Sequence, residues 1–432
     1  MKTIFCIQSV VGSGHHNTYA AMYCEILAEL GYRVVLLCNG PKRTLTKTLD
    51  EFEKQGRFTP VWGTDKNDRK KTAPPPVHAR GFVRRVMSFS WRWVRKFAMR
   101  IDIVLPPFRL DHSGPAWPSP EFLSNVEREY AAPDFLFFLY LDEYISRYPD
   151  LLCNLQSPWT GLLFNAALVK SETGYYVHKA LQTKACIGLC FLYPQYLAHY
   201  KKRFPQKQFI SLPDVPDSSL SAQEPAFCEK IRTIAAGRSI VMLAGSLAAR
   251  KGMVSLLRTA ALLQGKPYCF VFCGKFSWEA FGECTNEDSL FLRQTLSNPP
   301  ENCLFYLTYI ENEGVFNHVF RIADIVFAVY EGFDLSSGIV GKAAVFRKPI
   351  LVQSGGVMEK LVMSGPFGEA VLAGDPQAIA MGLERIRNRT TSSYVYDTYA
   401  STVSREALRQ DLGQFLESAK PNTIMDTLCP PL

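Results

Sequence analysis

Short apolar runs recur along the chain, and a polar loop and then a segment with helical spacing follow several of them. In the first half, the runs that predict buried strands are residues 3–10, 33–38, 134–141, 160–164 and 185–191. Between the first two, residues 17–30 have the apolar spacing of a helix, which Gly31 ends. A strand, a helix and a second strand in this order form a βαβ unit, so the pattern predicts an α/β fold with a parallel sheet.

The second half of the chain repeats this order. Its predicted strands are residues 239–243, 268–273, 303–308, 325–329 and 349–352, and residues 254–263 predict a helix. Residues 215–238 combine proline, serine and charge, which is typical of a linker. We therefore expect a first lobe over residues 1–215, a second over 216–403, and a terminal helix and tail over 404–432. Two such lobes predict a ligand cleft at the carboxyl edges of their sheets.

The composition is that of an ordinary globular protein, since 47% of the 432 residues are hydrophobic and 20% are charged. The twelve cysteines are scattered without a CxxC pair, which favours reduced core thiols and a cytoplasmic location. The chain enters a predicted strand almost at once, so we expect no signal peptide. No apolar run reaches the roughly 20 residues that cross a bilayer.

Positive charge is concentrated in one segment. Residues 66–100 carry a net charge of +10, which leaves the rest of the chain slightly acidic within a total of +8. At about 100° per residue, most aromatic side chains of residues 81–101 fall on one helical face and most arginines on another. This pattern is typical of interfacial helices, and it predicts docking on an anionic membrane surface, at the inner face of a membrane. The alternative is a core helix. A near-neutral body makes nucleic acid an unexpected partner.

Residues 323–349 read ADIVFAVYEGFDLSSGIVGKAAVFRKP, an apolar strand, a loop that Glu331 opens, and a helix start. Loops of this kind hold phosphorylated ligands in α/β proteins. The order resembles the nucleotide-sugar site of retaining glycosyltransferases of family four, whose sequences run ADIFVLPS, then EGFGLPVLEA, then small residues up to a proline. The resemblance implies the GT-B fold, which has two Rossmann-like lobes with an interlobe cleft. It also implies transfer of a hexosyl unit from a nucleoside diphosphate sugar to a hydroxyl acceptor, such as a glycan or a lipid-linked group.

The resemblance assigns roles within this loop. Glu331 is expected beside the donor sugar as a catalytic residue. The donor phosphates are expected to contact Gly332, Phe333, Ser336, Ser337 and Gly338. Counting back from Pro349, Lys342 stands where the family has a glutamate that binds the ribose, and the loop is three residues longer. Lys342 is therefore expected to pair with phosphate, and loss of nucleotide binding is the alternative interpretation of this lysine. An ordinary strand-to-helix connection with serine caps is the alternative.

The loop of residues 245–252, GSLAARKG, follows the first strand of the second lobe. It is similar to the family's GRL–KG loop, in which Arg and Lys neutralise the leaving diphosphate. Lys251 falls on the family's lysine. Arg250 is expected to replace its arginine, because Ser246 occupies that position. A solvated Arg–Lys pair at a helix start is the alternative interpretation.

In the first lobe, residues 12–17, GSGHHN, join the first strand to the first helix. A nicotinamide site is disfavoured, because Asn17 replaces its third glycine and no acid ends the second strand. The resemblance places Gly14 near the donor diphosphate and His15 at the catalytic centre, whereas a tight turn with surface histidines is the alternative.

Asn165 stands where the family has a catalytic histidine. Asp142 and Glu143 follow a predicted strand and are candidates for the acceptor hydroxyl, or are solvated acids. No metal-ligand spacing occurs, and we expect no cofactor. Two other functions stay open, a catalytically silent binding subunit and a nucleotide-sugar epimerase.

Overall fold

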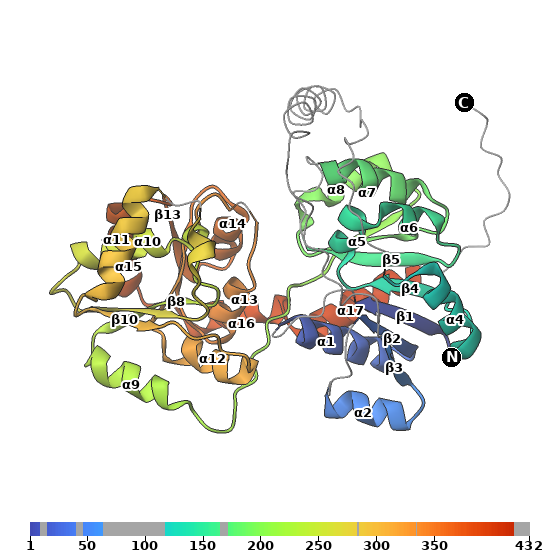
Figure 1. The fold of residues 1–432 in the computed structure, drawn as a ribbon, viewed down its shortest axis with the longest axis horizontal. Helices are drawn as coiled ribbons and strands as arrows, with labels where there is room; N and C mark the ends of the chain where they lie inside the picture. The colour runs from blue at the N-terminus through green and yellow to red at the C-terminus, as the bar shows by residue number, and fades with distance from the viewer. Residues whose placement is uncertain are drawn as a thin grey trace, which may run out of the picture. The chain divides into compact units, whose positions relative to one another are not determined.

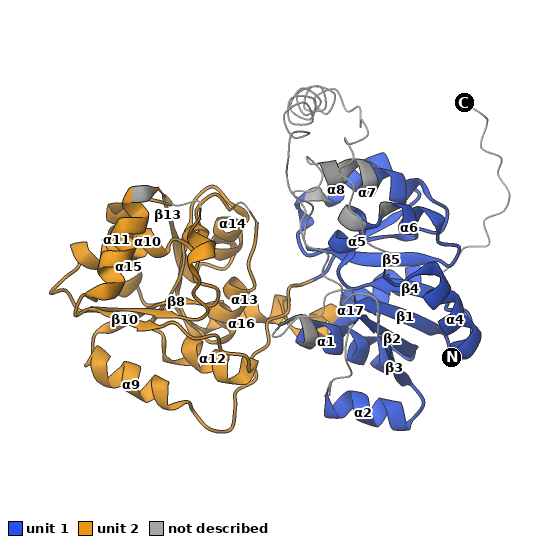
Figure 2. Cartoon of the chain, in the orientation of Figure 1, with its two compact units in different colours: residues 1–212, 409–432 blue, residues 213–408 orange. Residues whose placement is uncertain are grey.

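The computed structural model describes residues 1–8, 15–39, 46–63, 117–164, 172–282, 285–333 and 335–418. The chain divides into two compact units, residues 1–212 with 409–432 and residues 213–408 (Figure 2). Each unit is a parallel β-sheet with helices packed against it (Figure 1).

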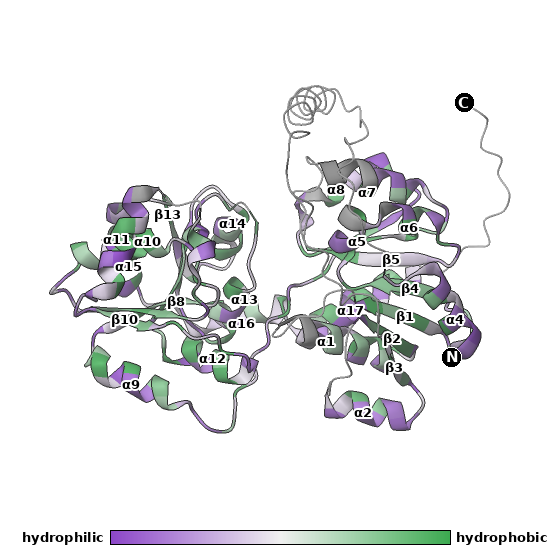
Figure 3. Cartoon of the chain, viewed as in Figure 1, coloured by the Kyte–Doolittle hydropathy of each residue, from purple (hydrophilic) through white to green (hydrophobic). Residues whose placement is uncertain are grey.

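Within its described residues, the first unit has seven strands in the order β3-β2-β1-β4-β5-β6-β7. The strands are β1 (Thr3–Gln8), β2 (Arg33–Asn39), β3 (Phe58–Gly63), β4 (Phe135–Phe138), β5 (Trp159–Leu163), β6 (Gly188–Phe191) and β7 (Gln208–Ser211). The helices are α1 (His15–Glu29), α2 (Lys47–Lys54), α4 (Pro120–Tyr130), α5 (Leu141–Arg147), α6 (Pro149–Asn154), α7 (Glu172–Gln182) and α8 (Leu197–Arg203). Strands β1 and β2 are almost wholly buried and are coloured hydrophobic in Figure 3.

The described part of the second unit has six strands in the order β10-β9-β8-β11-β12-β13. The strands are β8 (Ser239–Ala244), β9 (Tyr268–Cys273), β10 (Cys303–Tyr306), β11 (Ile325–Ala328), β12 (Ile350–Gln353) and β13 (Gly368–Val371). The helices are α9 (Ala226–Ala235), α10 (Met253–Leu262), α11 (Asn286–Ser297), α12 (Glu313–Ile322), α13 (Ile339–Val345), α14 (Val357–Ser364), α15 (Pro376–Arg387) and α16 (Ser393–Thr402). The last helix, α17 (Arg405–Ser418), begins in this unit and continues in the first.

The core of the second unit lies on both faces of its sheet. Along β8, Ile240 and Met242 pack into one apolar cluster, whereas Val241 and Leu243 pack into another. Successive side chains of a strand point to opposite faces, so helices cover both faces of β8. This is why its sequence is a continuous apolar run rather than an alternating one.

Three sequence expectations differ from the structure. The strand expected over residues 134–141 ends at Phe138, and α5 begins at Leu141. The linker expected over residues 215–238 contains the helix α9, and the second unit begins at Pro213. Strands β3, β7 and β13 were not expected.

The predicted terminal helix forms α17, whose residues from 409 onward group with the first unit. The side chain of Gln208 in β7 donates to the carbonyl of Ser418 at 2.7 Å. The predicted basic helix, residues 81–101, lies outside the described residues, so its docking on a membrane stays a prediction. Among the helices that the structure describes, none is long and apolar enough to cross a membrane.

Candidate functional site

The order of strands locates a candidate site in the second unit. From β8 the chain runs outward through β9 to β10, and it then returns to the other side of β8 as β11, β12 and β13. The direction of progression therefore reverses between β8 and β11. In open parallel sheets, ligands bind outside the carboxyl ends of the strands at such a reversal. The two loops that leave these strands are the loops that the sequence singled out.

The loop after β8 is packed directly on the end of β11. Gly252 has a φ of 71°, and a Cβ atom on it would lie 2.3 Å from the carbonyl oxygen of Val329. Only glycine permits this approach, because it has no Cβ atom and adopts positive φ readily. The glycine that precedes α10 therefore fixes how closely the two loops meet.

Glu331 is held by the loop after β8 at both its backbone and its side chain. Its backbone N–H donates to the carbonyl oxygen of Arg250 at 2.7 Å. Its carboxylate oxygen Oε1 accepts a hydrogen bond from the hydroxyl of Ser255, in the first turn of α10, at 2.5 Å. The carboxylate is thereby fixed at the reversal point while remaining partly exposed.

Two cations lie beside Glu331. The ammonium of Lys251 donates to the hydroxyl of Tyr330 at 2.9 Å and lies 4.5 Å from the centre of its ring. The guanidinium of Arg250 lies 5.3 Å from the centre of the Phe333 ring. Within the described part of the chain, neither cation forms an ion pair. Both positive charges are thus uncompensated by protein carboxylates in that part.

Gln353 shapes the loop that carries Glu331. Its side chain is 5% exposed, at the carboxyl end of β12. Its Oε1 accepts from the backbone N–H of Tyr330 at 3.3 Å, and its amide nitrogen donates to the carbonyl of Phe333. One buried amide therefore ties together both ends of residues 330–333.

Lys342 faces protein acceptors. Its ammonium contacts Glu313 Oε1 at 2.6 Å, the carbonyl of Asp217 at 3.0 Å, and the side-chain oxygen of Asn317. Its side chain is only 12% exposed. An ammonium has three protons, and three oxygen atoms accept them here. In the structure, Lys342 therefore links α13 to α12, whereas the sequence predicted a contact between Lys342 and phosphate.

The segment of residues 217–221 is hydrogen-bonded to α12, the helix that also carries the Lys342 partners Glu313 and Asn317. The side chain of Asn317 donates to the carbonyls of Asp217 at 3.0 Å and Ser219 at 2.8 Å. The backbone N–H of Ser221 donates to the carbonyl of Gly314 at 3.2 Å. This segment, expected as a linker, is part of the second unit.

Replacing Lys342 with Met is expected to destabilise the second unit by about 2–4 kcal/mol, because Glu313 is 19% exposed and would lose its partner. Lys342→Glu should destabilise it more, since two carboxylates would then face each other. Urea unfolding measures both effects. Adding Glu313→Gln to Lys342→Met should recover part of the loss. Equal stability of the wild type and Lys342→Met would show that this ion pair contributes nothing.

The serine loop faces a carboxylate of its own unit. Ser336 is buried, and Ser337 and Gly338 are partly exposed. A Cβ atom on Gly338 would lie 3.7 Å from a carboxylate oxygen of Asp214. The phosphate contact expected of Ser336, Ser337 and Gly338 stays a prediction. Arg250 and Lys251 form no ion pair within the described residues and are the stronger candidates for a diphosphate contact.

The candidates in the first unit are only partly covered by the structure. Gly14 and Asn165 lie outside the described residues, and His15 is described only as the first backbone position of α1. The carboxylate of Asp142 has a structural role, because it accepts a hydrogen bond from the backbone N–H of Phe164 at 2.8 Å. It holds the residue that follows β5.

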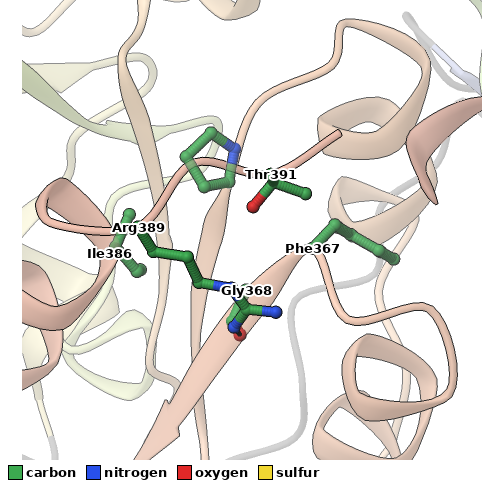
Figure 4. Close-up of a pocket in the computed structure, with 6 residues that line it drawn as sticks. Phe367, Gly368, Ile386, Arg389 and Thr391 are labelled. Atoms are coloured by element: carbon green, nitrogen blue, oxygen red, sulfur yellow. Dashed lines mark hydrogen bonds between the residues drawn. The ribbon is translucent and has the colours of Figure 1, made fainter. Parts of the chain in front are cut away.

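A small hollow of about 160 Å³ lies at the amino ends of β12 and β13 in the second sheet (Figure 4). Its lining includes Gly368 at the start of β13 and Pro349 just before β12. The guanidinium of Arg389 closes it by donating to the carbonyl of Pro366 at 2.7 Å. This volume includes space that is open to solvent, and the hollow has no room for a water molecule, so it is not a donor site.

The described residues contain no candidate metal centre, and three of their buried cysteines are unreactive. There, no group of three His, Cys, Asp or Glu side chains is arranged to hold a metal ion. Burial raises the pKa of the Cys186, Cys273 and Cys303 thiols to about 12, which keeps them protonated and unreactive.

Sequence reasoning missed Ser255, Tyr330 and Gln353. Two of them carried a usable signal. Ser255 is a polar position in an otherwise apolar stretch of helix, and Gln353 ends a fully apolar strand at its carboxyl edge. Tyr330 gave none, since an aromatic residue after an apolar strand is ordinary core.

No protein-family model matches the chain, and no curated protein matches it. Solved structures do. A glycosyltransferase from Rickettsia africae is 11% identical, with a TM-score of 0.57 over 98% of this chain and 99% of that one. HepE from Anabaena, in complex with UDP and glucose, is 13% identical, with a TM-score of 0.59 over 97% and 100%. Sucrose-phosphate synthase from Thermosynechococcus elongatus is 14% identical, with a TM-score of 0.58 over 97% and 99%. The chain therefore has the two-lobed GT-B fold expected from its sequence.

Proposed function

We propose that this protein is a retaining glycosyltransferase that moves a hexosyl unit from a nucleoside diphosphate sugar to a hydroxyl acceptor. One observation carries the proposal. Arg250, Lys251 and Glu331 meet outside the carboxyl ends of β8 and β11, where the order of the second sheet reverses. Two cations and one carboxylate at this place suit a donor with a diphosphate and a sugar.

The two cations suit the leaving group. Glycosyl transfer releases a nucleoside diphosphate, so negative charge grows on the diphosphate in the transition state. Positive groups that are already in place stabilise that charge most effectively. Lys342, which is paired with Glu313, has no such charge to offer. Arg250 and Lys251 form no ion pair within the described residues, and we assign this task to them.

Glu331 suits the sugar. Its carboxylate is fixed by Ser255 and lies on the same short loop as Phe333, which Arg250 contacts. A fixed carboxylate accepts hydrogen bonds from sugar hydroxyls and stabilises positive charge at the reacting carbon. Structures of HepE contain UDP, UDP and glucose, or UDP-glucose, so uridine nucleotides are the first donors to test.

The first test is binding. UDP, GDP, ADP or dTDP at ten times its Kd should raise the Tm by on the order of 3–5 °C, because a ligand that binds only the native state stabilises it. Lys251→Ala should remove most of the shift. Lys266→Ala, which removes an exposed lysine just past the other end of α10, should leave it intact. If none of the four nucleotides at millimolar concentration changes the Tm, the donor site is refuted.

A second candidate is a catalytically silent GT-B protein that acts as a binding or partner subunit. Lys342 favours it, because a protein-paired lysine stands where the family resemblance expects a ribose-binding glutamate. Donor hydrolysis and transfer assays separate the two functions. Nucleotide binding without turnover, over a panel of sugars and acceptors, would support the second candidate.

A further inference from the structure

We infer that Ser255 is a positioning residue that fixes the carboxylate of Glu331 for recognition of the donor sugar. The inference rests on the proposed function and adds a residue to it. Ser255 is 6% exposed, and its hydroxyl lies 2.5 Å from Glu331 Oε1. That distance is typical of a hydroxyl that donates to a charged carboxylate, which is a stronger bond than one between neutral groups.

The backbone alone does not fix this carboxylate. The N–H of Glu331 is held by Arg250, but the side chain still has three rotatable bonds. Within the described residues, Ser255 is the hydrogen-bond partner of Oε1, and Oε2 has none. One oxygen is thus held by the protein, and the other stays available to a ligand hydroxyl.

The neighbours of Ser255 argue against a purely structural role. Met253, Val254, Leu256 and Leu257 around it are all buried and apolar. A buried hydroxyl is costly unless it has a partner, and alanine is the better helix former. Stability alone is therefore served by alanine at this position.

Thr259, one turn further along α10, shows the ordinary arrangement. Its hydroxyl donates to the carbonyl of Ser255 in the same helix at 2.8 Å and also lies 3.2 Å from the carbonyl oxygen of Pro376. Serine and threonine within helices commonly satisfy themselves in this way. Ser255 differs from Thr259 because it donates to a charged carboxylate on the neighbouring loop.

If Ser255 acts through Glu331, removal of the Ser255 hydroxyl should weaken binding of the sugar and leave binding of the nucleotide unchanged. Within the described residues, the cations Arg250 and Lys251 do not contact the hydroxyl of Ser255, so diphosphate binding should persist. In Ser255→Ala, the affinity for UDP should stay within about twofold of wild type, whereas the affinity for UDP-glucose should fall about tenfold. A general loss of packing would lower both.

The experiment is calorimetric titration of the full chain with UDP and with UDP-glucose. The variants are Ser255→Ala, Ser255→Cys, which keeps the shape with a weaker donor, and Glu331→Gln, alone and combined with Ser255→Ala. Thr259→Val is the matched control, because it removes a buried hydroxyl of the same helix. The ratio of the two Kd values should change about tenfold in Ser255→Ala, less in Ser255→Cys, and not at all in Thr259→Val.

The double variant tests whether Ser255 acts through Glu331. In the Glu331→Gln background, Ser255→Ala should change the ratio no further, since coupled residues are not additive. An unchanged ratio in Ser255→Ala, with wild type binding both probes, overturns this inference alone. If Ser255→Ala does not fold, Ser255→Cys decides by the same ratio. If wild type binds another of the four nucleotides but not UDP, the same ratio is measured with that nucleotide and its glucose conjugate. If wild type binds none of UDP, GDP, ADP and dTDP, the proposed function falls, and this inference falls with it.

Discussion

Replacing Glu331 with Gln is expected to lower the turnover of glycosyl transfer about a hundredfold, while the Kd for UDP stays within about twofold. The substitution keeps the size of the side chain and removes its negative charge. Charge at the sugar develops only in the transition state, so the loss should appear in kcat rather than in nucleotide binding. Steady-state kinetics and titration with UDP measure the two quantities separately.

Glu301→Gln is the matched control for this prediction. Glu301 is exposed and precedes β10, so it lies at the amino ends of the strands, whereas Glu331 lies at their carboxyl ends. It should leave both kcat and the Kd for UDP unchanged. Equal turnover of Glu331→Gln and wild type would remove Glu331 from the catalytic centre.

Replacing Gly252 with Ala should cost about 3 kcal/mol or more of unfolding free energy. The new Cβ atom would meet the carbonyl of Val329 at 2.3 Å, on a residue with a φ of 71°. Either the loop after β8 or the end of β11 must then move, and Lys251 and Glu331 move with them. Denaturant unfolding measures the loss of stability, and the Kd for UDP should rise in parallel.

Gly265→Ala isolates the collision from the backbone cost. Gly265 has a φ of 75°, and a Cβ atom on it meets nothing within 4 Å. This variant should lose only about 1–2 kcal/mol, the cost of a left-handed conformation. If the two variants lose the same stability, the close contact between the loops has no energetic weight.

The central strands could be predicted from sequence because they are buried on both faces. The predicted strand at Tyr268–Cys273 matches β9 residue for residue, since six apolar positions lie between clear breaks. The missed strands β3, β7 and β13 are edge strands. An edge strand has fewer buried positions: β7 has one buried residue in four, and β3 contains Pro60. Their sequences therefore lack a continuous apolar run.

The end of a strand was harder to predict than its existence. The run is apolar from Phe135 to Leu141, because the turn after β4 and the start of α5 are buried as well. The hydrophobicity of a segment reports its burial. Burial continues past Phe138, although the backbone hydrogen bonding changes there from that of a strand to that of a helix.

The positions of candidate site residues could be predicted where the sheet sets them. Lys251 and Glu331 follow strands that the sequence shows, so their meeting needed only the order of strands. Lys342 was different, because its partners Glu313 and Asn317 lie on another helix and only packing brings them together. The sequence alone does not distinguish a lysine that binds phosphate from a lysine that pairs with a buried carboxylate.

The fastening of residues 217–221 decides where the second unit can be separated as an autonomous fragment. A fragment that starts at Ser239, after the expected linker, lacks both acceptors of the fully buried Asn317 amide and one acceptor of Lys342. Each buried polar group left without a partner costs about 1–3 kcal/mol. A fragment that starts at Pro213 keeps them all. The boundary for truncation is therefore drawn by hydrogen bonds rather than by composition.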